Sequence, residues 1–110
     1  MNHTSCHSLP YEGLRVIEFT HMVMGPTCGM LLGDLGAEVI KIEPLGGDTT
    51  RTLLGSGSGF FPMFNRNKKS VVLDLKSAEG VEAALRLIDT ADVVSCLLYT
   101  SDAADEGLGV

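Results

Sequence analysis

The feature that most constrains the fold is the alternation of short apolar runs with segments of helical spacing. Apolar runs rich in β-branched residues cover 14–20, 37–43 and 70–75, and a fourth begins at Asp92. Between them lie segments with helical spacing or helix-start signals, at 27–35, 60–67 and from Ser77 onward. Strands that are apolar at nearly every position are typical of parallel sheets covered by helices. The sequence therefore predicts an α/β fold with a parallel sheet and flanking helices.

Local signals mark where the helices begin and end. Pro26 suits the first turn of the first helix, and Gly36 is placed to terminate it. Ser77 is a candidate N-cap for the last helix. Four apolar residues of that helix recur at helical spacing and predict one buried stripe: Val81, Ala84, Leu85 and Ile88.

Composition excludes several classes of protein. Of 110 residues, 45% are hydrophobic and 20% are charged, which is typical of a chain that forms a core. The net charge of −6 argues against a general binder of nucleic acids or anionic membranes. It leaves open a local basic site for a phosphate.

Cysteine spacing and hydropathy bear on the cellular location to expect for this chain. The three cysteines, Cys6, Cys28 and Cys96, have no close spacing, so we expect neither a disulfide framework nor a metal site. The N-terminus has no basic flank and no apolar segment of a secretory signal. The uncharged stretch 19–33 contains Pro26 and is shorter than the roughly 18–20 residues of a spanning helix. We therefore expect a cytoplasmic location.

The first strand–helix–strand unit invites comparison with a dinucleotide-binding fold. Glu43 lies where an acid that binds a ribose would follow the second strand. The glycines at 25, 29, 33 and 36, however, do not have the G-x-G-x-x-G spacing. Glycines four residues apart share one helix face, which favours close packing on a sheet over NAD binding.

Two further segments are candidates for a phosphate. The GSGSG sequence at 55–59 is either a phosphate loop or a surface loop. Arg66, Lys68 and Lys69 form a basic cluster in an acidic chain, which predicts phosphate contacts; the alternative is a solvated turn.

His21 lies at the end of the first predicted strand. Open α/β sheets bind ligands at the carboxyl ends of their strands, so His21 is a candidate for a ligand site. No residues form a nucleophile–base pair or a metal cluster in the sequence pattern. The residues alone thus indicate a βαβ domain for a phosphate-bearing ligand.

Three blocks of the chain together resemble family III CoA-transferases of the CaiB/BaiF type, which include formyl-CoA transferase and α-methylacyl-CoA racemase. The blocks cover 13–51, 60–80 and 90–94. They contain the motifs GPTC, LGAEVIKIE, GDTTR, FNRNKKS and LDLK in the family's order and spacing.

The resemblance implies a fold, a reaction and an assembly. The family has a Rossmann-like large domain, of which this chain would be the N-terminal part, and forms interlocked homodimers. Its transferases move CoA between an acyl-CoA thioester and a carboxylic acid through an aspartyl intermediate. The nucleophilic aspartate lies beyond this chain, so no catalytic residue is expected here. No permanently bound cofactor is expected, since CoA and acyl-CoA are substrates.

The resemblance also implies which residues contact CoA. The expected set is His21, Val23, Met24, Leu73, Asp74, Leu75 and Lys76. Lys76 is the expected partner of a phosphate. Two positions depart from formyl-CoA transferase, which has Gln in place of Val23 and Arg in place of Pro44. The loss of the Gln argues against a specificity for oxalate and formate.

The end of the chain departs from the family. After TADVV, relatives continue with a segment resembling ENFRPG, whereas this chain reads CLLYTSDAADE. That peptide matches eleven consecutive codons in one frame of a transposon-based sequencing adapter. We therefore expect an adapter-encoded tail at 96–110, a family domain at 12–95 and a flexible arm at 1–11.

Without this tail the chain has 11 acidic and 8 basic residues. We expect 12–95 to form an incomplete sheet with open edges, and the chain alone to be poorly stable and inactive. Two other functions stay open at this point. One is an acyl-CoA racemase of the same family, and the other is a non-catalytic nucleotide-binding module.

Overall fold

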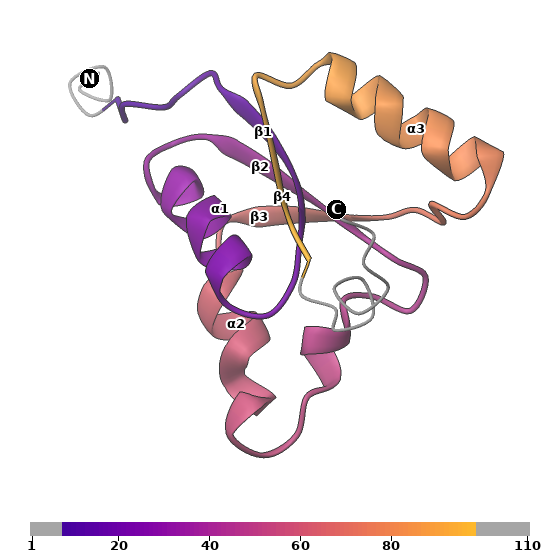
Figure 1. Ribbon diagram of the computed structural model, residues 1–110. Helices are drawn as coiled ribbons and strands as arrows, with labels where there is room; N and C mark the ends of the chain where they lie inside the picture. Colours follow the sequence, from indigo (N-terminus) through magenta and orange to yellow (C-terminus); the bar gives the residue numbers. More distant parts are fainter. Residues whose placement is uncertain (1–7, 99–110) are drawn as a thin grey trace.

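Residues 8–98 are described in the computed structural model of the chain, which forms a four-stranded parallel sheet with helices around it (Figure 1). The strands are β1 (Arg15–Thr20), β2 (Glu38–Glu43), β3 (Lys68–Val72) and β4 (Val93–Leu97). The helices are α1 (Met24–Asp34), α2 (Phe60–Phe64) and α3 (Ala78–Asp89). Two short 3-10 helices, Thr49–Thr52 and Gly55–Gly59, lie between β2 and α2.

The strand order is β3-β2-β1-β4, and all three pairings are parallel. The chain proceeds outward from β1 to β3 and then returns to place β4 on the other side of β1. This reversal creates a switch point between β1 and β4, where doubly wound sheets bind their ligands. The predicted α/β class with a parallel sheet and flanking helices is confirmed.

One face of the sheet is apolar. Ile17, Ile40 and Ile42 point to this face and form a buried cluster. Leu87 and Ile88 from the end of α3 pack against the cluster. The C-terminal end of helix α3 therefore packs on the apolar face.

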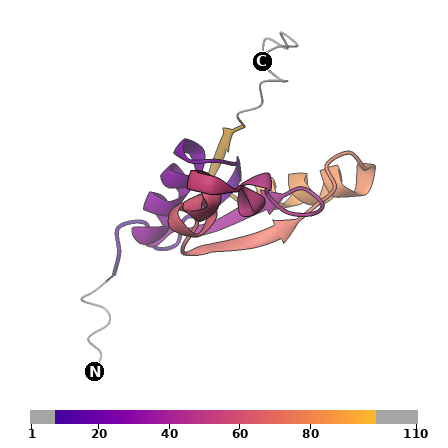
Figure 2. The same cartoon turned by 90° about the horizontal axis from the view of Figure 1, so that it is seen from below.

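The opposite face carries charged side chains over its carboxyl-terminal half. Glu18, Lys41 and Glu43 are fully buried there, although they sit within apolar strands. Helix α1 approaches so closely that a Cβ on Gly29 would overlap the Glu18 carboxylate. The α1 and α2 helices group on this side, away from α3 (Figure 2).

The helix signals in the sequence are confirmed. Helix α1 begins at Met24, which places Pro26 in its first turn. Gly36 has a φ of 108° and ends the helix with a hydrogen bond from its N–H to Gly33 O. The Ser77 hydroxyl accepts a hydrogen bond from the Gly80 N–H at 3.0 Å, as expected of an N-cap.

Two predicted details are wrong. β3 occupies 68–72 rather than 70–75, because Lys68 and Lys69 already pair with β2. In α3, Val81 and Leu85 of the predicted stripe are exposed. The helix approaches the preceding segment most closely at Gly80, where a Cβ would overlap the Asp74 carbonyl. Its buried side therefore runs from Gly80 through Ala84 to Leu87 and Ile88.

The predicted arm and tail fall largely outside the described residues, which exclude 1–7 and 99–110. From the arm, Tyr11 donates its N–H to Leu35 O at 2.8 Å and packs against the Val16 cluster. From the tail, Cys96 and Leu97 belong to β4 and pair with β1. Over 8–98, no helix combines the length and the hydropathy needed to cross a membrane.

Candidate functional site

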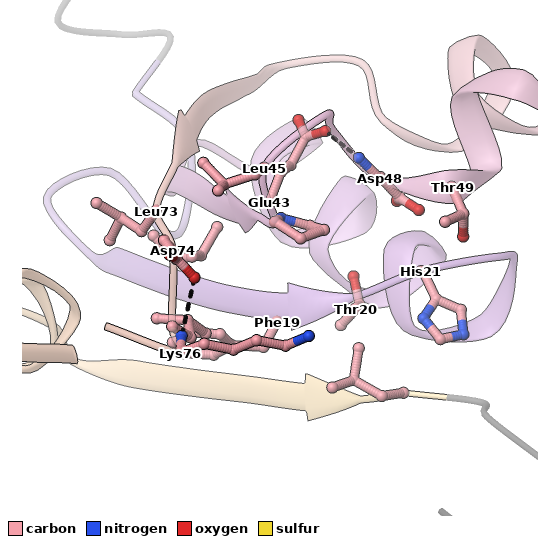
Figure 3. Close-up of a pocket in the computed structure, with 14 residues that line it drawn as sticks. Phe19, Thr20, His21, Glu43, Leu45, Asp48, Thr49, Leu73, Asp74 and Lys76 are labelled. Carbon is pink, nitrogen blue, oxygen red and sulfur yellow. Dashed lines mark hydrogen bonds between the residues drawn. The ribbon is translucent and has the colours of Figure 1, made fainter. Parts of the chain in front are cut away.

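A cavity of about 460 Å³ opens at the carboxyl ends of the strands. The end of β1 contributes Phe19 to His21, the end of β2 and its following loop contribute 42–45 and 48–49, and the segment after β3 contributes 73–76. Leu98 lies on the rim just beyond β4. The cavity therefore occupies the place where parallel sheets hold ligands (Figure 3).

Five of the seven residues expected to contact CoA line this cavity: His21, Leu73, Asp74, Leu75 and Lys76. They come from β1 and from the segment after β3, which are more than 50 residues apart in the chain. Val23 and Met24 do not line it. Val23 is the residue that precedes α1, and Met24 is an exposed residue in its first turn.

The turn that carries Lys76 is held by local hydrogen bonds. The Lys76 N–H donates to Asp74 Oδ1 at 3.0 Å, and the Ser77 N–H donates to Asp74 O at 3.1 Å. The N-cap of α3 then fixes the end of the turn. In Figure 3 the Lys76 side chain extends along the cavity toward the end of β1. Its ammonium group is thus presented to whatever fills the cavity.

The walls of the cavity are mainly apolar. Phe19, Ile42, Leu45, Leu73 and Leu75 supply carbon surface from three strands and their loops. The polar and charged residues that line the cavity with them are Thr20, His21, Glu43, Asp48, Thr49, Asp74 and Lys76, of which Lys76 is the lysine that can meet an anion. A ligand that combines an apolar or ring portion with an anionic group matches this arrangement.

Glu43 lies at the base of the cavity and is fully engaged. Arg51 donates to both carboxylate oxygens, at 2.8 and 2.7 Å, and Ser70 and the Asp48 N–H also donate to them. The Arg51 hydrogen bonds are the main reason that the pKa of Glu43 falls to about 2. Since both oxygens are occupied, Glu43 acts as an anchor for the 44–51 loop and not as an acceptor for a ribose.

A second buried acid joins this loop to the sheet. Asp48 Oδ2 lies 3.0 Å from Lys41 Nζ, and Asp48 Oδ1 accepts the Thr50 N–H at 2.8 Å. Burial opposes the ionised form of Asp48, but the hydrogen bonds from Thr50 and Lys41 outweigh burial and lower its pKa. Sequence reasoning did not single out Lys41, Asp48 or Thr50. The signal was a lysine inside the apolar strand VIKIE, which has to find a buried partner.

The three predicted phosphate contacts lie away from the cavity, each in an ion pair. Arg66 binds Asp34 at 2.7 Å and Lys69 binds Glu38 at 2.6 Å, both at the surface. Lys68 is buried and binds Glu18 at 2.7 Å, and it also donates to Pro26 O and to the Asn65 side chain. Burial is the main cause of its lowered pKa.

The remaining candidates, the GSGSG segment and the cysteines, show no feature of a ligand site in the part of the chain that the structure describes. The GSGSG segment is an exposed 3-10 helix that does not line the cavity. Cys28 and Cys96 are free thiols. Among the residues that the structure describes, no three His, Cys, Asp or Glu side chains are grouped to hold a metal ion.

The fold and the cavity define a doubly wound α/β fold with an open cavity at the carboxyl ends of its parallel strands. The family model for CoA-transferase family III matches residues 11–109. The chain therefore belongs to CoA-transferase family III.

Curated relatives share close to half of the aligned residues. A probable fatty acyl-CoA transferase of Mycobacterium tuberculosis, Rv3272, is 45% identical over 97 residues, which is 83% of this chain and 25% of that protein. A formyl-CoA:oxalate CoA-transferase of Rhodopseudomonas palustris is 47% identical over 88 residues, which is 76% and 21% of the two chains. This chain thus spans about a quarter of the length of the relatives it matches.

Solved structures agree with this assignment. The orthorhombic form of Rv3272 has a TM-score of 0.73 and 48% identity, and covers 78% of this chain and 24% of its own. A CaiB/BaiF family protein from Brucella suis has a TM-score of 0.76 and 37% identity, and covers 92% of this chain and 29% of its own.

Proposed function

We propose that this chain forms coenzyme A-binding elements of an acyl-CoA transferase, which moves CoA between a CoA thioester and a carboxylic acid. The observation that carries the proposal is the cavity at the carboxyl ends of the strands, with Lys76 and His21 among apolar walls. Relatives are named for transfer between different acids, among them formate and oxalate, and succinate and glutarate. The acyl group is therefore left unassigned.

The cavity residues divide the binding of CoA between them. The Lys76 ammonium pairs with a phosphate group, since an exposed lysine binds phosphate as a point charge. Leu73 and Leu75 pack on the uncharged part of the ligand, and His21 donates or accepts a hydrogen bond at the end of β1. Val23 and Met24 border the ligand where the chain enters α1.

The reaction follows the covalent route expected of the family. An aspartate carboxylate attacks the thioester carbonyl, which forms an acyl-aspartyl anhydride and releases CoA as a thiolate. The thiolate attacks the aspartyl carbonyl, which gives an aspartyl-CoA thioester and releases the first acid. The second acid then takes CoA by the same two steps in reverse. This carboxylate is assigned to no residue of the present chain, and the enzyme is proposed to act as an interlocked homodimer in the cytoplasm.

Calorimetric titration of the chain with CoA, NAD and ATP tests the proposal. We expect saturable binding of CoA and no binding of NAD. Lys76→Ala should weaken CoA binding by about tenfold, because one charged hydrogen bond is lost. Lys69→Ala removes an exposed lysine of the same charge outside the cavity and serves as the matched control. NAD binding without CoA binding would overturn the proposal.

A further inference from the structure

The backbone at His21 is held on both sides by buried side chains. The carbonyl of Thr20, in the peptide unit before His21, accepts a hydrogen bond from Lys41 Nζ at 2.6 Å. The N–H of Met22, in the peptide unit after His21, donates to Thr50 Oγ1 at 2.9 Å. Both torsion angles of His21 are therefore restrained by groups that lie outside its own strand.

Met22 adopts a backbone conformation that needs such support. Its φ is 68°, in the left-handed region that an unbranched residue other than glycine, asparagine or aspartate rarely occupies. The Thr50 hydroxyl contacts this residue twice, since it accepts the Met22 N–H and lies 3.9 Å from Met22 Sδ. The left-handed turn at Met22 redirects the chain from β1 into α1, immediately after the residue that lines the cavity.

The two supports form one unit. Asp48 joins them, because its Oδ1 accepts the Thr50 N–H at 2.8 Å and its Oδ2 lies 3.0 Å from Lys41 Nζ. Lys41, Asp48 and Thr50 are all buried, with Lys41 1% and Thr50 0% exposed. Side chains this deeply buried depend on one another for polar partners, because water is excluded.

We propose that Lys41 and Thr50, joined by Asp48, are positioning residues that fix the backbone on both sides of His21 and so aim its imidazole into the cavity. The inference rests on the proposed function, because it assigns the consequence to CoA binding. None of the three acts on CoA as a catalytic residue. Figure 3 shows Thr20, His21, Asp48 and Thr49 gathered at this end of the cavity.

Thr50 is the residue to change, because its hydroxyl can be removed without changing its shape. Thr50→Val keeps the volume but loses the acceptor for the Met22 N–H. Thr50→Ser keeps the hydroxyl and loses only a methyl group. Thr52→Val is the matched control, since Thr52 is an exposed threonine of the same 3-10 helix whose hydroxyl donates to the local Thr49 carbonyl.

Two measurements on the full chain read out the effect. Calorimetry gives the dissociation constant for CoA, with the melting temperature recorded in parallel. Amide hydrogen exchange by NMR gives the protection of the Met22 N–H without any ligand. Thr50→Val should weaken CoA binding by about three- to tenfold and lower the protection of Met22 by a similar factor. Thr50→Ser should restore most of both, and Thr52→Val should alter neither.

The outcomes separate three claims: that Thr50 positions His21, that Thr50 only stabilises the fold, and that the chain binds CoA. A Thr50→Val chain that melts earlier but binds CoA with unchanged affinity assigns Thr50 to stability alone and overturns the inference. A wild-type Met22 amide that exchanges as fast as amides in exposed loops overturns it as well. If the wild-type chain does not bind CoA while Met22 is protected through Thr50, the unit of Lys41, Asp48 and Thr50 still holds the backbone at His21, and the proposed function fails.

Discussion

The two faces of the sheet come from the same strands but are stabilised by different interactions, apolar packing on one and buried ion pairs on the other. On the side of α3, Ile17, Ile40 and Ile42 form a cluster that is held by burial of carbon surface. On the side of α1 and α2, Glu18 and Lys41 occupy the alternate positions of the same strands, at 0% and 1% exposure. In the carboxyl-terminal halves of β1 and β2, apolar and charged side chains alternate residue by residue between the two faces.

The difference lies in how strictly each face depends on geometry. Apolar packing tolerates changes of similar volume, whereas a buried charge costs several kcal/mol unless its partners stay in place. In this chain the charged face also supports the 44–51 loop and the end of β1, which contribute part of the cavity lining. The face with the buried charges, whose stability depends most on exact geometry, is thus also the one that holds these cavity segments in place.

The largest expected effect is the loss of one charge from the charged face. Lys41→Met leaves the carboxylates of Glu18 and Asp48 buried without this cation, so the free energy of unfolding should fall by about 3–5 kcal/mol. Ile40→Val, the neighbouring change on the apolar face, should cost only about 1 kcal/mol. Urea denaturation of both variants checks the comparison, and equal losses would contradict it.

The next effect concerns the close approach of α1 to the charged face. Gly29→Ala should lower the free energy of unfolding by about 1–3 kcal/mol, because the new methyl group would overlap the Glu18 carboxylate. Gly33→Ala in the same helix meets its nearest atom, Asn67 O, at 3.3 Å. That variant should lose less stability than Gly29→Ala, because the new methyl group needs a shift of only a few tenths of an ångström and alanine favours a helix. Thermal melts compare the two, and the reverse order would mean that α1 does not pack through Gly29.

The third effect is the pH dependence of the charged face. Glu43 has a pKa of about 2 in the folded chain, below the ordinary value of 4.5, mainly because of its hydrogen bonds to Arg51. A carboxyl group with a lowered pKa stabilises the fold fully above pH 4.5 and loses this contribution as the pH falls toward 2. We expect a loss of about 2 kcal/mol over that window, reduced by solvent screening because the Arg51 side chain is 42% exposed.

Urea denaturation from pH 6 to pH 2.5 measures this dependence. Glu43→Gln removes this group and should reduce the slope of the curve over the same window, to which other carboxyl groups with a lowered pKa, such as Asp48, still contribute. A wild-type curve as flat as that of the variant would show that Glu43 is not held as described.

The smallest effect belongs to the outer side of α3. Leu85 is 55% exposed, so Leu85→Ser should change the free energy of unfolding by no more than about 0.5 kcal/mol. Ala84→Ser, one residue away on the buried side, should cost more. A large loss for Leu85→Ser would instead support the stripe that periodicity alone predicts.

The sequence predicts much of this fold because its signals are local. Alternating apolar runs, Gly36 at a helix end and the Ser77 cap each act within a few residues, and the structure confirms them. The start of β3 and the buried side of α3 were wrong because they depend on contacts with distant segments. Lys68 reads as part of an exposed basic cluster until Glu18, 50 residues earlier, is seen to pair with it.

The candidate site divides in the same way. His21 could be singled out because it follows a predicted strand of a parallel sheet, and ligands bind at that edge. The 73–76 segment was expected at the site only through the resemblance to family III CoA-transferases. The unit formed by Lys41, Asp48 and Thr50 could not, since it joins a strand and a loop through side chains of ordinary type. The sequence feature that could have pointed to it is Lys41, a charged residue in an apolar strand.

An NMR titration of the ¹⁵N-labelled chain with CoA tests the central claim most directly. The account predicts saturable shifts at the amides of His21 and of residues 73–76, with little change at 66–69. Shifts centred on Arg66, Lys68 and Lys69, with His21 and Lys76 unchanged, would contradict it.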